Sequence, residues 1–209
     1  MSFAVCEHAL LRHRMASLRD RATPSNTFRE ILAEIGAILT TEALRALPET
    51  TRPVTTPLET VAHPVLASPP PALVAVLRAG LGLLEGARRV LPEAPIGHIG
   101  LVRDETTLQP SGYLQRLPPG LAERGALLLD PMLATGGSAI VAVDQLKAAG
   151  CARIHFLCVV AAPEGVARLI AAHPDVPILA AALDRELDAR GYILPGLGDA
   201  GDRCFGTEG

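Results

Sequence analysis

The chain has 209 residues, of which 49% are hydrophobic and only 3% aromatic, so it can bury a large aliphatic core as one domain or two small ones. Its formal net charge of −3 gives no electrostatic case for binding nucleic acid. No apolar stretch approaches the length that is needed to cross a bilayer, which argues against a membrane protein.

The cysteines and the first residues indicate a reducing compartment. Cys6, Cys151, Cys158 and Cys204 form no Cys-x-x-Cys pair, so neither a zinc site nor a disulfide scaffold is expected. The N-terminal residues lack a basic region followed by an apolar run, so no secretory signal is expected. We therefore expect a cytoplasmic protein with reduced thiols.

The N-terminal part of the chain predicts two helices and then a proline-rich segment. Apolar residues recur at helical spacing over 10–18 and over 27–44, where Thr27 and Glu30 have the spacing of a capping box. A basic cluster consists of Arg12, Arg14, Arg19 and Arg21. Without interleaved aromatics, it is interpreted as a solvated helix face or a subunit contact. Seven prolines between 48 and 71 exclude a long helix and predict loops or edge strands.

After this segment, short apolar runs alternate with helical patterns. The expected strands are 73–77, 96–102, 127–129, 154–160 and 178–182, and the expected helices are 81–90, 139–149 and 163–172. This alternation predicts an α/β fold with a mainly parallel sheet and helices on both of its faces.

The segment after the strand at 127–129 carries the strongest functional signal. Asp130 stands at the carboxyl end of that strand, where open α/β sheets bind their ligands. A turn with two hydroxyls and two glycines, residues 135–138, then leads into a helix, and a helix N-terminus attracts phosphate. Because a carboxylate repels phosphate, Asp130 suits sugar hydroxyls or a hydrated Mg²⁺ instead. Together these features predict a site for a ribose 5-phosphate.

Arg78 and Arg103 each follow another expected strand. A guanidinium in that position can bind pyrophosphate through paired hydrogen bonds, or it can simply be exposed to solvent. The acids beside the second arginine, Asp104 and Glu105, are interpreted as solvated side chains.

Two glycine-rich motifs are rejected as dinucleotide-binding sites. Residues 80–86 have one residue too many, and residues 196–201 are followed by too few residues for the helix and strand that this fingerprint requires. The glycine-rich tail instead exposes backbone N–H and C=O groups, which can match the donors and acceptors of a pyrimidine edge.

Four stretches, in order along nearly the whole chain, resemble the type I phosphoribosyltransferases. Residues 130–138 read Asp-Pro-Met-Leu-Ala-Thr-Gly-Gly-Ser, which is typical of the uracil branch of that family. Pro131 stands where most members carry a second acid. The other three stretches, which agree with the same branch, are 77–82, 161–165 and 191–202.

This resemblance implies the type I phosphoribosyltransferase fold, with a mainly parallel sheet flanked by helices. It implies a single domain over 1–209, with N-terminal helices at 1–47, an α/β core at 72–182 and a C-terminal base-binding hood at 183–209. It also places a protruding β-hairpin and a mobile loop over the active site between Arg103 and Leu121.

The resemblance further implies an enzyme of pyrimidine salvage that converts uracil and phosphoribosyl pyrophosphate (PRPP) into UMP and diphosphate. The catalytic residues would be Asp130, Arg103 and Asp199. The PRPP-binding residues would be Arg78, Arg103, Asp130, Pro131, Met132, Leu133, Ala134, Thr135, Gly136, Gly137, Ser138 and Asp199. The uracil-binding residues would be Ile193, Gly198, Asp199 and Ala200. Mg²⁺ would be bound through PRPP, GTP is a candidate allosteric activator, and a homodimer or larger homo-oligomer is expected.

Two alternatives stay open. A related transferase for another base is disfavoured by the base-binding tail. A pyrimidine-sensing RNA-binding regulator on the same fold would need a basic face, which the net charge does not suggest. Val76, Val102 and residues 109–112 depart from the usual family pattern while leaving the anion-binding positions intact.

Overall fold

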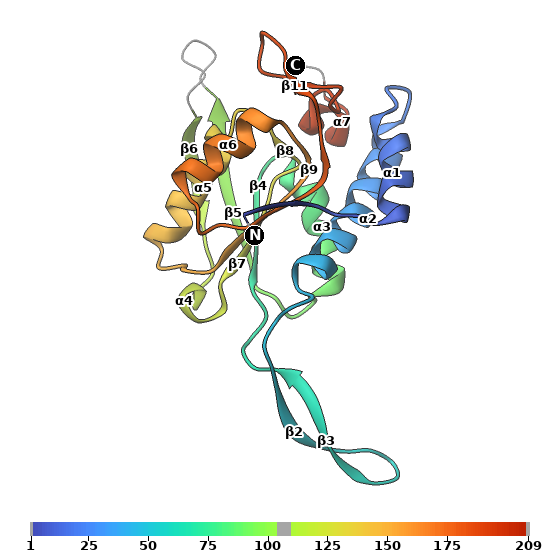
Figure 1. Ribbon diagram of the computed structural model, residues 1–209, viewed down its shortest axis with the longest axis vertical. Coiled ribbons are helices and arrows are strands. Elements are labelled where there is room, and N and C mark those ends of the chain that lie inside the picture. The colour runs from blue at the N-terminus through green and yellow to red at the C-terminus, as the bar shows by residue number, and fades with distance from the viewer. Residues whose placement is uncertain (1, 104–109, 208–209) are drawn as a thin grey trace.

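The computed structural model describes residues 2–103 and 110–207, without the side chains of 103, 110 and 111. Within these residues one sheet has the strand order β1-β10-β9-β7-β4-β5-β6, and a short β8 pairs with β9 (Figure 1). Its strands are β1 (Phe3–Val5), β10 (Ile178–Leu183), β9 (Ile154–Ala161), β7 (Ala126–Leu129), β4 (Ala72–Leu77), β5 (Ile96–Arg103), β6 (Pro110–Arg116) and β8 (Met132–Leu133). All pairs are parallel except β5 with β6. The predicted α/β class is confirmed.

Helices cover both faces of the sheet (Figure 1). The helices α1 (Ala9–Arg19), α2 (Ser25–Ala43) and α3 (Gly80–Val90) share one core with Leu73 and Ala75 of β4. The helices α5 (Gly137–Ala148) and α6 (Pro163–Ala172), with the short α4 (Leu121–Arg124), share the other core with Val74 and Val76. Successive side chains of a strand point to opposite faces, so a continuous apolar run such as β4 fits a strand that is buried on both sides.

The helix α2 corrects one local prediction. It begins at Ser25 with Pro24 at the cap position, and no side chain caps it. Thr27 and Glu30 therefore lie inside the first turns, and the predicted capping box is wrong. The capping-box spacing also occurs within helices, so the apolar period located the helix but did not locate its first residue.

Two glycines allow α2 and α3 to cross closely. A Cβ at Gly86 would overlap the carbonyl oxygen of Ala33, and a Cβ at Gly36 would lie 2.5 Å from the carbonyl oxygen of Leu83. Gly86, the last glycine of residues 80–86, thus serves the packing of α3 on α2.

A hairpin projects from the proline-rich segment that was predicted to form loops or edge strands. The strands β2 (Glu49–Thr55) and β3 (Thr60–Leu66) pair antiparallel and project from the rest of the fold, and most of their residues are exposed (Figure 1). Between Arg103 and Leu121, where the sequence predicted a hairpin, β6 returns antiparallel beside β5. The residues that join these two strands, 104–109, lie outside the described part, so the protruding tip and the mobile loop stay predictions. A two-stranded ribbon leaves alternate N–H groups unpaired, so Pro53 and Pro64 are compatible with it.

The C-terminal segment forms a cap above the carboxyl ends of the strands. It contains β11 (Glu186–Leu187), β12 (Ile193–Leu194) and α7 (Ala200–Phe205), and α7 packs beside α2. All four cysteines are free and buried. Among the helices of residues 2–103 and 110–207, none combines the length and apolar content needed to span a membrane.

Candidate active site

A cavity of about 610 Å³ lies at the carboxyl ends of β4 and β7. One wall is the turn that leads into α5, and the opposite wall is the glycine-rich C-terminal segment. Its position agrees with the general rule that open α/β sheets bind ligands beyond the carboxyl ends of their strands.

The turn at 134–138 presents backbone and hydroxyl groups to this cavity. Gly136 has φ of +79°, a conformation that side chains other than glycine rarely adopt, and α5 begins at the next residue. The first helical hydrogen bond runs from the Ile140 N–H to the Gly136 carbonyl at 3.0 Å. The preceding N–H groups have no partner within the helix, and Thr135 and Ser138 line the same wall. The turn is therefore suited to an anion.

Asp130 lies at the floor of the cavity, directly after β7. Its residue is only 9% exposed, and its Oδ1 accepts one backbone hydrogen bond from the Met132 N–H at 3.4 Å. Burial raises the pKa of Asp130 to about 7, against a weaker lowering effect of that hydrogen bond. Burial, together with the Asp130 charge, raises the pKa of the Cys158 thiol. A buried carboxyl group with so little compensation suits a hydroxyl-bearing or cationic ligand.

The start of α6 packs behind the turn at 134–138, on the side away from the cavity. A Cβ at Gly165 would overlap the carbonyl oxygen of Ala134, and Arg168 Nη1 donates to the Thr135 carbonyl at 3.2 Å. The Ala162 N–H donates to the Leu133 carbonyl at 2.9 Å. The turn is therefore held through its own carbonyl groups, which leaves its N–H side toward the cavity.

The opposite wall is built from backbone. Ile193, Gly198 and Ala200 line the cavity, and Gly198 has φ of +70°. Asp199 lines it as well and caps α7, because its Oδ1 accepts from the Asp202 N–H at 2.9 Å. This wall offers peptide groups rather than long side chains to a ligand.

Arg78 joins the two walls. It follows β4, and the peptide bond before it is cis. Its Nη2 donates to Asp202 Oδ1 at 3.1 Å, and its guanidinium carbon lies 5.8 Å from the centre of the Phe205 ring. Hydrogen bonds from Thr207, and then from Arg78, lower the pKa of Asp202. The Arg78 guanidinium at the cavity edge adds positive charge opposite the turn at 134–138.

The family model described as uracil phosphoribosyltransferase matches residues 5–207. A protein of that name from Streptococcus agalactiae serotype III (strain NEM316) is 50% identical over 99% of both chains. Another from Paracoccus denitrificans (strain Pd 1222) is 49% identical over 98% of this chain and 97% of its own. The chain belongs to the uracil phosphoribosyltransferase family.

Solved structures share the fold of this chain. The AQ2163 protein from Aquifex aeolicus superposes with a TM-score of 0.94 at 35% identity, covering 99% of each chain. An adenine phosphoribosyltransferase from Trypanosoma brucei reaches a TM-score of 0.53 at 14% identity, over 76% of this chain and 67% of its own, and shows the shared fold alone. The predicted type I phosphoribosyltransferase fold is confirmed.

The structure brings most of the residues implied by the family resemblance to one cavity. These are Arg78, Asp130, Met132, Leu133, Ala134, Thr135, Gly136, Gly137, Ser138, Ile193, Gly198, Asp199 and Ala200. Pro131 is not among the lining residues, and its carbonyl accepts from the N–H groups of Val159 and Val160. The side chain of Arg103, like the whole of Asp104 and Glu105, lies outside the described residues. The individual roles of all the residues named in this paragraph stay predictions.

Sequence reasoning missed several residues that contribute to this cavity. Arg190 and Tyr192 line the cavity, with the guanidinium carbon 5.5 Å from the ring centre. In the sequence, Arg190 stands directly before the motif at 191–202 and Tyr192 lies within it, and this position was their only signal. Gly165 was noted as part of a motif, but its packing role depends on a contact between distant segments.

Proposed function

We propose that the chain transfers the 5-phosphoribosyl group of PRPP to N1 of uracil, forming UMP and diphosphate. The observation that carries this proposal is a single cavity with an anion-binding turn and the buried Asp130 on one side and a backbone-lined hood on the other. A phosphorylated sugar and a planar base would meet between these walls.

Each wall would hold one part of the reactants. The turn at 134–138 would bind the 5′-phosphate through N–H groups and hydroxyls, and Asp130 would accept hydrogen bonds from ribose hydroxyls. Arg78 would bind the diphosphate end. The C1′–O bond to diphosphate breaks through an oxocarbenium-like state, N1 forms the new bond to C1′, and the N1 proton is released. Placement of the reactants and neutralisation of the leaving charge supply most of the acceleration.

Mg²⁺ fits this arrangement as a partner of PRPP rather than as a resident metal. In the described residues no group of three or more His, Cys, Asp or Glu side chains gathers to hold a metal ion. Asp130, buried with one long backbone hydrogen bond, suits the water shell of such an ion. When bound, Mg²⁺ would neutralise charge on the departing diphosphate.

The base would be recognised through peptide groups of the hood. Uracil presents alternating carbonyl oxygens and N–H groups, and the backbone at Ile193, Gly198 and Ala200 can offer the complementary donors and acceptors. Such a site rejects a base with a different pattern, because a buried peptide group would then lose its partner.

We expect PRPP to bind more weakly as the pH falls below about 7. Burial raises the pKa of Asp130 to about 7, so the group is protonated in the free protein below that pH. If PRPP binds the protein with Asp130 ionised, binding below this pH must first release the Asp130 proton. The affinity for PRPP then falls by up to about tenfold per pH unit. Calorimetric Kd values for PRPP with Mg²⁺, compared between wild type and Asp130→Asn, check this. The phosphates of PRPP titrate in both proteins, so parallel pH curves would contradict a role for Asp130.

The function itself is tested by UMP formation from uracil and PRPP, with Mg²⁺ or with a chelator. We expect UMP with Mg²⁺ and little or none after chelation. Uracil, cytosine, orotate and hypoxanthine are then offered together, and we expect the uracil product to dominate. No UMP under any metal condition would defeat the proposal, and preference for another base would replace uracil by that base.

The domain extent, location and oligomeric state are also proposals. We propose one domain over 1–209, a cytoplasmic location and a homo-oligomer. The projecting β2–β3 hairpin, where Leu58 is 95% exposed, offers a surface that a second copy could cover. Activation by GTP stays a prediction from the family resemblance.

A further inference from the structure

Arg19 and Asp184 form a partly buried ion pair between distant parts of the chain. Arg19 ends α1, and Asp184 directly follows β10 with its side chain only 4% exposed. The guanidinium donates from Nη2 to Oδ1 at 2.6 Å and from Nη1 to Oδ2 at 2.8 Å. The interpretation of Arg19 as part of a solvated cluster is therefore wrong, because the partner carboxylate lies far away in sequence and could not be identified from helical spacing.

This ion pair binds Gly196, in the middle of the hood, at both its N–H and its carbonyl group. The Gly196 N–H donates to Asp184 Oδ2 at 2.8 Å, and Arg19 Nη1 also donates to the Gly196 carbonyl at 2.9 Å. Asp184 is itself anchored, since its N–H donates to the Ala161 carbonyl at the end of β9 at 2.8 Å. Gly196 lies between Ile193 and Gly198, two of the residues that line the base side of the cavity.

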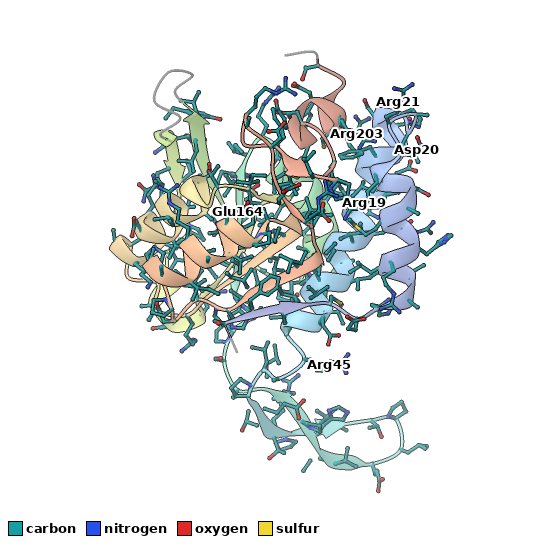
Figure 2. The ribbon with its side chains drawn as sticks, turned by 45° about the horizontal axis from the view of Figure 1, so that its top comes forward. Arg19, Asp20, Arg21, Arg45, Glu164 and Arg203 are labelled. Carbon is teal, nitrogen blue, oxygen red and sulfur yellow. The ribbon has the colours of Figure 1, made fainter. Side chains whose placement is uncertain are left out.

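A second arginine adds to the same connection between α1 and the hood. Arg203 of α7 donates from Nη1 to the carbonyls of Leu18 at 2.8 Å and Leu197 at 3.0 Å, and from Nη2 to the Asp20 carbonyl at 2.6 Å. Its guanidinium carbon lies 4.4 Å from the centre of the Phe28 ring. Figure 2 shows Arg19, Asp20 and Arg203 gathered where the end of α1 meets the hood.

We propose that Arg19 and Asp184 are positioning residues for uracil recognition. Through them the N-terminal helix α1 sets the position of the hood peptides that bind the base. A hood that reads the base through backbone atoms has no side-chain rotamer with which to compensate for a displaced loop, so a shift at Gly196 passes directly to Ile193 and Gly198. The turn at 134–138 is held separately by α6, so the part of the PRPP site that binds the 5′-phosphate stays in place.

The test compares steady-state kinetics of wild type, Arg19→Lys, Arg19→Gln, Asp184→Asn and the Arg19→Gln/Asp184→Asn double variant. We expect the uracil KM to rise about tenfold or more in the single Gln and Asn variants, while the PRPP KM changes by less than about threefold. Arg19→Lys keeps the charge but not the paired geometry, so it should recover part of the uracil affinity. The control is Arg12→Gln on the same helix, whose Glu7 partner at 2.6 Å is 81% exposed.

The proposal rests on the proposed function, and the two fail differently. A wild-type protein that makes no UMP defeats the function. An active wild type whose variants raise both KM values equally, or neither, overturns the positioning role. Should a single variant fail to fold, the double variant decides, because removing both charges leaves no unpaired ion in the interior. A selective rise of its uracil KM supports the proposal, and an unchanged one overturns it.

Discussion

Asp130→Asn is expected to lower turnover with uracil and PRPP by about 10²–10³-fold, which is the cost of losing one preorganised electrostatic contact in an enzyme site. The carboxylate lies buried at the cavity floor, where its charge would act on the ribose with little screening by water. Asparagine keeps the size and an acceptor oxygen but removes the charge. The comparison is of kcat at saturating substrates, measured as UMP released.

The same variant should not lose stability above neutral pH. Burial raises the pKa of Asp130 in the folded chain to about 7, above its ordinary value of 3.8, so ionisation of the folded form costs stability as the pH rises between these values. Asparagine escapes this cost, so its Tm at about pH 8 should equal or exceed that of wild type. Asp175→Asn, at an exposed carboxylate paired with Lys147, is the control for both measurements. Wild-type turnover in Asp130→Asn would remove Asp130 from the mechanism.

Gly165→Ala is expected to reduce kcat/KM for PRPP by about 10²-fold, because a displacement near 1 Å at a reacting group has an effect of that order. The new methyl group would overlap the Ala134 carbonyl of the turn and lie 2.8 Å from the Leu133 carbonyl just before it, and neither backbone atom can rotate away. Either the turn or the start of α6 must move. Overpacking of this kind also costs about 1–3 kcal/mol of stability.

The control for this change is Ala167→Ser, which adds one atom to the exposed face of the same helix. It should leave kcat/KM for PRPP and the Tm unchanged. The diagnostic result is a Gly165→Ala protein that still folds, by circular dichroism, but binds PRPP weakly. Normal PRPP binding by that protein would show that α6 does not set the position of the turn.

The core of the fold and half of the site were predictable because their signals are local. The strand at 127–129, Asp130 and the turn at 135–138 are contiguous, so one stretch of sequence specifies the strand end, the acid and the helix start. Apolar periodicity likewise found the main strands and helices to within a few residues, because each of these elements packs on a core.

The features that the sequence left unresolved depend on contacts between distant segments. The β2–β3 hairpin has little core to pack on, so its mostly exposed strands show no clear alternation, and the prolines obscured it. The Gly165 contact with the turn and the Arg19–Asp184 pair join residues that no periodicity relates. The short α7 was also missed, although Asp199 followed by Asp202 has the character of a helix start.

The position of UMP in a crystal structure of this chain tests the central claim most directly. We expect its phosphate to accept hydrogen bonds from the turn at 134–138, its ribose hydroxyls to lie at Asp130, and its uracil edge to face the backbone at Ile193, Gly198 and Ala200. A UMP bound elsewhere, for example in the groove behind the hood that Arg21 and Arg203 line, would contradict the assignment of the cavity as the active site.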